Sequence, residues 1–528
     1  MKFKTLSVAL LALSLTIAQV GPLPLEASAE GTSNLKFNVD VAKQTITGEQ
    51  VQSAIAEIDK LAQKQIDANS VPGMAISVVF NDKLVFAKGY GVREVGKSEK
   101  IDADTVFQLA SISKSVGSTV VAAAVGEKIV SWDSKISDLD PAFALSEPWV
   151  TSNLTIRDLY SHRSGLPAHA GDILEDLGYD RAQILHRLRY QKPASSMRAA
   201  YAYTNFGLTE AAIATAAAAK TTWEQLSEEK LYKPIGMTST SSRFADFWSR
   251  QNKALGHMLV DGKWVHKHQR TPDPQSPAGG VSSSVNDMAK WMRLQIDSGK
   301  FEGKQIVDQD AIEETHSPQM KSGQSPITGL PEFYGLGFNV SYDKHGRLVL
   351  SHSGGFELGA ATNVKMVPSE KLGVCVLTNG SPIGMAEGIA ATFTDQALYG
   401  KQSQDWMALF KQVFADPAEL GLTVGNLKAP AKAPSPALKS DAYVGTYEND
   451  FYGNCKVAAA GEGLTISLGP SLTKPIKHYD RDAFTWEMDT EDLTGVSAIT
   501  FAVGADGKAK SVLFDSLNNN GQGLFIRK

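Results

Sequence analysis

A serine stands three residues ahead of a lysine, Ser111 and Lys114, in the stretch QLASISKSVGST. On a helix this spacing places both side chains on one face about one turn apart, so the lysine amine can reach the serine hydroxyl. A hydroxyl nucleophile needs such a base. The same spacing recurs at Ser33, Ser227, Ser341 and Ser471. By itself it has little specificity, and its alternative is a helix N-cap serine followed by a surface lysine.

The residues that follow Ser111 indicate the environment of the lysine. They are rich in alanine and valine and carry little charge, which predicts a helix that is hydrophobic nearly all round and therefore buried. Burial disfavours the ammonium form and lowers the pKa of a lysine. We therefore expect Lys114 to be partly neutral, as a base must be.

A second segment with polar groups is YAYTNFG, where Tyr203 and Asn205 precede an alanine-rich helix. The alternative is an ordinary turn before that helix. Tyr201 is the rival tyrosine, and we expect it to serve in packing. His162, in SHRSGLP, is a tempting general base, but we interpret it as structural.

The third segment is LSHSGGFELG, in which His352, Ser353, Gly354 and Gly355 end a predicted strand and begin a glycine-rich bend. Glycines at this point let a substrate lie close against the strand edge. The alternative for His352 is a strand-end histidine with a structural role only.

Taken in chain order, Ser-x-x-Lys, Tyr-x-Asn and His-x-Gly resemble the three motifs of the serine β-lactamase and penicillin-binding protein superfamily. The similarity is to its class C-like branch, which includes D-aminopeptidases and carboxylesterases. The phrases TIRDLYSHRSGLP, LYKPIGMTST and SPAGGVSSSVNDMAKW are similar to that branch as well. Separately, the C-terminal segment resembles the lipocalin-like barrel that some members carry.

The resemblance implies a role for each residue. Ser111 would attack the substrate carbonyl, Lys114 would take part in its deprotonation, and Tyr203 would pass the proton to the leaving group. Asn205 would orient the substrate and the lysine amine. The backbone N–H groups of Ser111 and Gly355 would form the oxyanion hole. Whether the lysine or the tyrosine is the principal base stays open.

One departure from the family pattern is His352, because the family usually has Lys-Thr-Gly where this chain has His-Ser-Gly. An imidazole has an ordinary pKa of about 6.5, so it is mostly neutral at pH 7. Efficient β-lactam hydrolysis is therefore not expected. Binding of carboxylate substrates is expected to improve near pH 5.5 relative to pH 8, as the ring gains charge.

Composition excludes several classes of protein. Acids and bases are interspersed, with a formal net charge of −5, so no basic stripe indicates nucleic acid binding. The two cysteines, Cys375 and Cys455, form no disulfide framework, and we expect both to be unpaired. His257, His266 and His268 have no carboxylate or cysteine at ligand spacing. The prediction is therefore no metal and no cofactor.

The N-terminus resembles a signal peptide. Two early lysines precede an apolar run from Leu6 to Ile17, and Ala27-Ser28-Ala29 follows, which predicts cleavage after residue 29. The run is shorter than the roughly 20 residues of a spanning helix, which makes a membrane anchor the lesser alternative. We expect a periplasmic or secreted protein whose mature chain has no membrane span.

The rest of the chain divides into three parts. Residues 30–426 are expected to form the hydrolase domain, 427–440 a proline-rich linker, and 441–528 a small all-β barrel with short alternating strands. In the first domain a β-hairpin near residue 81 and several late strands flank a mainly helical middle. This pattern predicts an α+β fold with one antiparallel sheet assembled from the two ends.

These observations predict an exported serine hydrolase that works through an acyl-enzyme. The predicted activity is that of a peptidase or amidase on small peptides, including peptides with D-residues or nonribosomal peptides. A carboxylesterase or a weak β-lactamase is the alternative within this class. A non-catalytic β-lactam-binding or scaffold protein is the alternative from another class. Small peptides, amides or esters are the expected partners, and the oligomeric state is left open.

Overall fold

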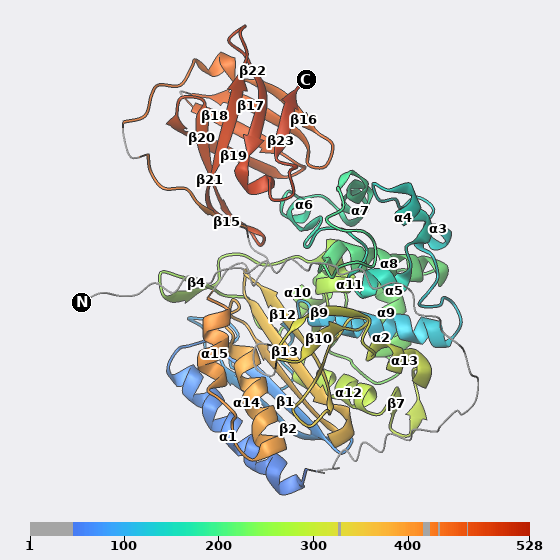
Figure 1. The fold of residues 1–528 in the computed structure, drawn as a ribbon. Coiled ribbons are helices and arrows are strands. Elements are labelled where there is room, and N and C mark those ends of the chain that lie inside the picture. Colours follow the sequence, from blue (N-terminus) through green and yellow to red (C-terminus); the bar gives the residue numbers. More distant parts are fainter. Residues whose placement is uncertain (1–45, 326–328, 416–422, 431–432, 462) are drawn as a thin grey trace, which may run out of the picture. The chain divides into compact units, whose positions relative to one another are not determined.

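The main sheet of the described residues is antiparallel. The computed structural model describes residues 46–528 except for 326–328, 416–422, 431–432 and 462. The strand order is β2-β1-β14-β13-β12-β11-β10-β9 (Figure 1). In that order the strands are Lys83–Gly91, Gly73–Phe80, Leu372–Thr378, Ala360–Val367, Leu348–Phe356, Asn339–Tyr342, Pro331–Tyr334 and Met320–Gln324. The hairpin β1–β2 joins β14 from the other end of the domain, so the prediction of one sheet built from two ends is confirmed.

Different helices cover the two faces of this sheet. They are α1 Gly48–Asp67, α14 Met385–Tyr399, α15 Trp406–Val413, α12 Val285–Ile296 and α2 Ile112–Gly126. Met74, Ile76 and Val78 of β1 share a hydrophobic cluster with α1 and α14, whereas Ala75 and Val79 share another with α12 and α2. Alternate residues of a strand point to opposite faces. The sheet is therefore a middle layer, with α1 and α14 together on one side (Figure 1).

The helix α2 confirms the predicted buried helix. Nearly all its side chains are buried, including that of Lys114. The hydroxyls of Ser115 and Ser118 donate hydrogen bonds to the carbonyls of Gly337 and Leu336, which lie just before β11. These bonds hold the helix against the loop that leads into the sheet.

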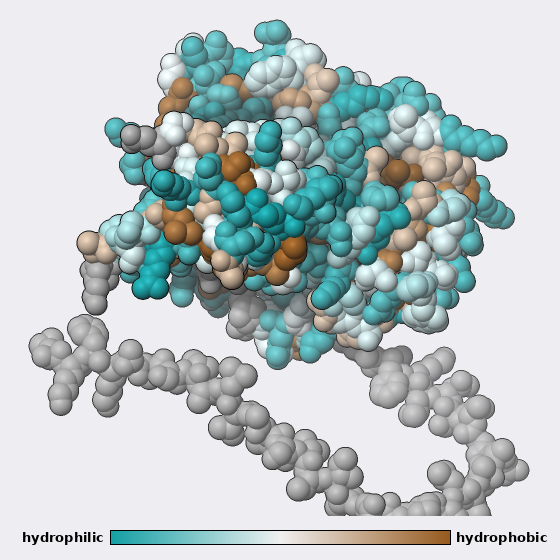
Figure 2. Space-filling model, turned by 90° about the horizontal axis from the view of Figure 1, so that it is seen from above, coloured by the Kyte–Doolittle hydropathy of each residue, from teal (hydrophilic) through white to brown (hydrophobic). Residues whose placement is uncertain are grey.

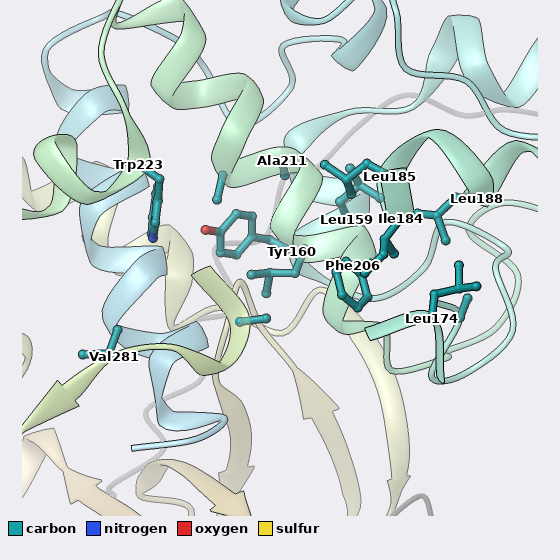
Figure 3. Close-up of a cluster of buried hydrophobic side chains, with 14 of the residues drawn as sticks. Leu159, Tyr160, Leu174, Ile184, Leu185, Leu188, Phe206, Ala211, Trp223 and Val281 are labelled. Carbon is teal, nitrogen blue, oxygen red and sulfur yellow. The ribbon is translucent and has the colours of Figure 1, made fainter. Parts of the chain in front are cut away.

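A helical lobe occupies the middle of the chain. Its helices are α3 Ile136–Leu139, α4 Pro148–Asn153, α5 Ile156–Tyr160, α6 Asp172–Asp176, α7 Arg181–Arg187, α8 Asn205–Ala218, α9 Trp223–Ser227, α10 Phe244–Ser249, α11 Ser276–Gly279 and α13 Gln309–Thr315. Figure 3 shows Leu159, Leu174, Ile184 and Phe206 converging from α5, α6, α7 and α8. Their packing holds α6 and α8 together at their starts, Asp172 and Asn205.

The C-terminal region is a closed β-barrel, as predicted. Its strands are β16 Gly445–Asn449, β17 Gly453–Ala460, β18 Gly463–Leu468, β19 Leu472–Asp480, β20 Ala483–Asp489, β21 Leu493–Val503, β22 Ala509–Phe514 and β23 Leu524–Arg527. Pairing of β21 with β22 closes the sheet. Cys455 is buried here and Cys375 in β14, and both are free thiols.

One predicted boundary needs adjustment. The strand β15, Thr423–Asn426, pairs in parallel with Leu493–Val496 of β21. The predicted boundary at residue 426 assigns it to the hydrolase domain, whereas the structure places it in the barrel sheet. The pairing joins segments far apart in the chain, so the local sequence pattern does not report it.

The surface shown in Figure 2 is mainly hydrophilic, with hydrophobic residues scattered in small spots. No helix among the described residues combines the length and the apolar character that crossing a membrane requires. The predicted signal peptide, residues 1–29, lies outside the described part of the chain.

The contact between Gly337 and α2 gives a prediction about stability. Gly337 has a φ of 87°, and a Cβ there would lie 2.7 Å from the Lys114 carbonyl oxygen and 2.9 Å from Cβ of Ser118. We expect Gly337→Ala to lower the free energy of unfolding by about 1–3 kcal/mol more than Gly346→Ala does. Gly346 is the matched control, because its φ is also positive, 75°, but its Cβ would meet nothing within 4 Å. Urea unfolding measures the free energy of unfolding of both variants. Equal losses in the two variants would show that α2 moves to accommodate the added methyl group without cost.

Candidate active site

Ser111 lies where the chain turns from the short strand β3, Phe107–Gln108, into α2. Ala110 has a φ of 47°, a left-handed conformation that non-glycine residues rarely adopt. Ser111 is the N-cap residue of the helix, but its side chain makes no capping hydrogen bond. The N-cap alternative is therefore wrong for this hydroxyl, which is left to other partners.

Lys114 is one of these partners. Its Nζ lies 3.1 Å from Oγ of Ser111, and it donates to Oδ1 of Asn205 at 2.6 Å and to the carbonyl of Ala278 at 2.9 Å. The side chain is fully buried. Burial lowers the pKa of Lys114 to about 7, and the charge of Asp172 limits the fall. The amine is thus partly neutral at neutral pH and can accept the proton of the serine.

The tyrosine Tyr203 contacts the same pair. Burial raises the pKa of the Tyr203 hydroxyl well above its ordinary value, and the nearby Ser111 side chain lowers it in part. The ammonium of Lys114 lies 4.5 Å from the centre of the ring. A protonated phenol next to the serine oxygen can donate a proton and can also relay one from the lysine.

The ring of His162 packs against that of Tyr203. Its ring centre lies 4.5 Å from that of Tyr203 and 4.7 Å from that of Tyr334. Its Nδ1 accepts a hydrogen bond from the backbone N–H of Thr204, and burial holds its pKa well below the usual value. A neutral, fully buried ring agrees with the structural interpretation. Tyr201 packs in the same aromatic group, 5.6 Å from Tyr334.

A residue that the sequence analysis missed is Asp172, the first residue of α6. Oδ1 of Asn205 accepts from Lys114, so its Nδ2 donates, and it does so to Oδ2 of Asp172 at 2.7 Å. The same oxygen lies 2.9 Å from Nδ1 of His169. Asp172 therefore orients the asparagine and adds negative charge near the lysine. Its only sequence signal is an acid-rich run, DILED, which is too common to be specific.

His352 is neutral, and the structure shows why. The ring is 3% exposed, Nδ1 donates to the Ser353 carbonyl at 2.6 Å, and Nε2 accepts from the Tyr334 hydroxyl at 2.8 Å. Burial, and next the charge of Lys114, lowers the pKa of His352 to about 3. The expected gain of charge between pH 8 and 5.5 is therefore wrong, because sequence alone does not report burial of the ring.

The strand β12 brings the glycines against the serine. A Cβ on Gly354 would lie 2.3 Å from the Leu109 carbonyl and 2.8 Å from the backbone nitrogen of Ser111. Only glycine allows this approach. Gly355 follows on the same strand and lines the same cavity as Ser111. The Ser353 hydroxyl accepts a hydrogen bond from Asn363 at 2.9 Å.

The three predicted motifs meet in one cavity of about 340 Å³. Among the predicted residues that line it are Ser111, Tyr203, Asn205, His352, Ser353, Gly354 and Gly355. Lys114 lies beneath them, where its amine reaches Ser111. His257 and His266 lie elsewhere, with ring centres 6.1 Å apart, and the described residues include no cluster of three or more potential metal ligands.

Comparison with known proteins agrees with this arrangement. The family model described as Beta-lactamase matches residues 58–399, more than half of the chain. The chain therefore belongs to the Beta-lactamase family. A second model, described as Domain of unknown function (DUF3471), matches residues 429–525, which include the barrel.

Several known proteins are similar to this chain. The chain is 24% identical to the Unguisins hydrolase ungD of Aspergillus violaceofuscus over 84% of each protein. It is also 24% identical to the D-alanyl-D-alanine-carboxypeptidase/endopeptidase AmpH of Escherichia coli, over 67% of this chain and 92% of AmpH. The octameric penicillin-binding protein homologue from Pyrococcus abyssi has a similar fold, with a TM-score of 0.60 and 19% identity over 90% of this chain and 100% of that one.

The electrostatic interaction between Asp172 and Lys114 predicts a change in the pH dependence of Ser111 modification. Removing the carboxylate should lower the pKa of Lys114 further, because Asp172 raises it. The rate at which a neutral fluorophosphonate modifies Ser111 should rise with pH as the lysine loses its proton. In Asp172→Asn that rise should occur at lower pH than in the wild type, where it is expected near pH 7.

Asp138→Asn is the control for this experiment, since Asp138 is exposed on α3. Its pH profile should match that of the wild type. A profile of Asp172→Asn that does not move, or that moves to higher pH, would contradict the assigned electrostatic contact.

Proposed function

We propose that this protein is a serine hydrolase that works through an acyl-enzyme, and that its substrates are small peptides or amides. The observation that carries the proposal is the buried amine of Lys114, 3.1 Å from Oγ of Ser111, with a pKa lowered to about 7. A neutral amine at this place makes the serine a competent nucleophile.

The proposed reaction moves one proton and exchanges one bond. Oγ of Ser111 forms a bond to the substrate carbonyl carbon while Lys114 takes its proton. The N–H groups of Ser111 and Gly355 hold the developing oxyanion. The bond from carbon to the leaving group then breaks, and the proton passes through Tyr203 to that group. Water then attacks the carbonyl carbon of the acyl-enzyme ester and gives up a proton through the same residues. The bond to Oγ of Ser111 breaks, Oγ regains a proton, and the product acid leaves.

The state of Tyr203 favours amides over esters. An amine leaves only when its nitrogen is protonated, whereas an alkoxide or phenoxide leaves more easily. The raised pKa of Tyr203 keeps a proton next to the serine oxygen. The names of two relatives, Unguisins hydrolase and D-alanyl-D-alanine-carboxypeptidase/endopeptidase, support peptides, including ones with D-residues, as the substrate class.

Hydrolysis of β-lactams is expected to be weak. The family's usual lysine would offer a permanent cation to the carboxylate of these compounds, and His352 stays neutral with a pKa of about 3. The alternative is a protein that is acylated on Ser111 and does not hydrolyse the acyl-enzyme. The described residues of the site show no feature that favours this alternative.

Active-site labelling and a substrate panel test the proposal. A fluorophosphonate should label the wild type on Ser111 and should not label Ser111→Ala. Among p-nitroanilides and p-nitrophenyl esters of L and D amino acids, we expect turnover of anilides. Lys114→Ala and Tyr203→Phe should each reduce kcat by about 10²- to 10⁴-fold, as loss of a general acid or base does.

The control for these variants is Tyr201→Phe, because Tyr201 packs beside the site and does not line the cavity. It should retain wild-type activity. Labelling that persists in Ser111→Ala would place the nucleophile elsewhere. Labelling of the wild type without any turnover would favour the non-catalytic alternative.

We also propose that the protein is exported, on the strength of residues 1–29. Intact mass measurement of the protein recovered from the periplasm or medium should show a chain beginning at Glu30. Recovery of the uncleaved chain in the cytoplasm would contradict this.

A further inference from the structure

One carboxyl group of the catalytic cavity has no part in the proposed reaction. It belongs to Glu387, the third residue of α14, which lines the cavity together with Ser111 and Ser353. The residue is 5% exposed, and its Oε2 atom has no hydrogen-bond partner among the described residues. A buried acceptor without a donor costs free energy. A hydrogen-bond donor from a ligand would remove this cost.

The fold holds Glu387 at this place. The helix α14 begins after Gly384, whose φ is 78° and where a Cβ would lie 2.5 Å from the carbonyl oxygen of Phe410 in α15. Further along the helix, Phe393 packs into the hydrophobic cluster that includes Ile76 of β1. The first turn of α14, which contains Glu387, is thus held between the sheet and α15.

A carboxylate in the first turn of a helix can be purely structural, because the N-terminal end of a helix favours negative charge. Glu49 has the equivalent position in α1, and it is exposed. Glu387 is buried, and burial raises its pKa to about 7, against the smaller effects of its own backbone N–H and of the Ser353 side chain. Helix stability does not require this burial, so the position of Glu387 favours a role toward a ligand.

The polar neighbour of Glu387 is Ser353 of β12. Oγ of Ser353 accepts a hydrogen bond from Nδ2 of Asn363 at 2.9 Å. The serine hydroxyl can therefore turn its own hydrogen toward Glu387 or toward a ligand. A ligand that reaches both residues meets a hydroxyl donor beside a carboxylate acceptor.

Glu491 shows the contrasting case of a cavity carboxylate that the protein itself satisfies. This residue lies in the loop between β20 and β21 and also lines the cavity. Its two oxygen atoms accept hydrogen bonds from the backbone N–H groups of Glu357 at 2.9 Å and Leu358 at 3.2 Å. Oε2 of Glu387 has no such donor in the described part of the chain.

The chemistry of the ligand follows from the pair of Ser353 and Glu387. An amide group has an N–H donor for the carboxylate and a carbonyl oxygen for the hydroxyl. A carboxylate has acceptors only and carries the same charge as ionised Glu387, so it is disfavoured. An ammonium would satisfy Glu387, but it has no acceptor for the hydroxyl. An amide therefore fits this pair best.

The leaving group is the part of the substrate that we expect at this pair. In the proposed reaction the leaving group takes its proton from Tyr203, whose ring centre lies 6.4 Å from that of His352. His352 directly precedes Ser353 on β12. A leaving group next to Tyr203 therefore has its far end near Ser353.

We propose that Glu387 and Ser353 form a subsite that binds an amide at the far end of the leaving group and rejects a free carboxylate there. The inference rests on the proposed function and names its substrate class. The substrates are peptides in which the residue after the cleaved bond continues into a further amide, and not peptides in which that residue ends in a carboxylate. On this account the protein is not a carboxypeptidase.

The test compares two substrates that differ in one group. Alanyl-alanine and alanyl-alaninamide are supplied in L,L and D,D forms, with a free or an acetylated N-terminus, so that selectivity at the other end does not hide the effect. The pH is 8, where Glu387 with its pKa of about 7 is mostly ionised. Mass spectrometry measures the release of alanine or alaninamide. The wild type should have the higher kcat/KM for the amide.

Glu387→Gln should reduce this preference. It removes the like charge and offers an N–H donor, so kcat/KM for alanyl-alanine should rise by about 10- to 100-fold, the range of a charged hydrogen bond. The value for alanyl-alaninamide should change much less. The ratio of the two values does not depend on the fraction of the variant that is folded, so a destabilised variant still gives a result.

Two variants serve as matched controls. Glu387→Asp keeps the charge and should keep the preference for the amide. Glu49→Gln makes the same substitution in the first turn of α1, where the side chain is exposed, and should behave as the wild type does. Thermal melting of every variant shows whether the fold is retained.

A second measurement does not depend on turnover. Phenylacetamide and phenylacetate have the same shape and differ in charge, and each is tested for its ability to slow the labelling of Ser111 by a fluorophosphonate. In the wild type phenylacetamide should protect at lower concentration than phenylacetate. Glu387→Gln should shift the ratio of the two protecting concentrations at least tenfold toward phenylacetate, the lower end of the roughly 10- to 100-fold range for a charged hydrogen bond.

The outcomes separate this inference from the proposed function. Absence of labelling at Ser111 would overturn the proposed function and the subsite with it. Labelling together with a wild-type preference for alanyl-alanine, or with a preference that Glu387→Gln does not change, would overturn only the subsite. If neither dipeptide is cleaved, the protection ratio of phenylacetamide and phenylacetate decides, and an equal ratio in the wild type and in Glu387→Gln would contradict the subsite.

Discussion

The burial of one ammonium group, that of Lys114, is the constraint on which the site depends. A lysine on an apolar helix loses its hydration, and only well-placed acceptors make this tolerable. Here the acceptors are Ser111, Asn205 and the Ala278 carbonyl, which come from three separate parts of the chain. Burial lowers the pKa of this amine to about 7 and the charge of Asp172 limits the fall, so that near neutral pH the amine lies between its two protonation states.

The fold supplies the geometry for this balance. The helix α2 is held by hydrogen bonds from Ser115 and Ser118 to the loop before β11, and β12 approaches Ser111 closely because Gly354 has no side chain. The packing of the helical lobe places Asp172 and Asn205 at the starts of their helices. The barrel adds the loop with Glu491. Each layer of the molecule therefore contributes a contact to one cavity.

Much of this could be predicted from sequence because it depends on local patterns. The apolar run after Ser111 predicts a buried helix, and the order of three short motifs identifies the family. The charge of His352 could not be predicted, since its pKa depends on burial and on Tyr334, which lies in another strand. Asp172, Glu491 and β15 were missed for the same reason, because each acts through partners far away in the chain.

The most direct test of the account is the protonation state of Lys114 itself. Nitrogen-15 NMR of the lysine Nζ groups, with Lys114→Met used for assignment, follows the titration of this amine as the pH is raised. The account predicts that the Lys114 signal is half-titrated near pH 7, while exposed lysines keep their protons beyond pH 9, as the ordinary lysine pKa of about 10.4 requires. A Lys114 ammonium that stays charged with the exposed lysines would contradict the central claim.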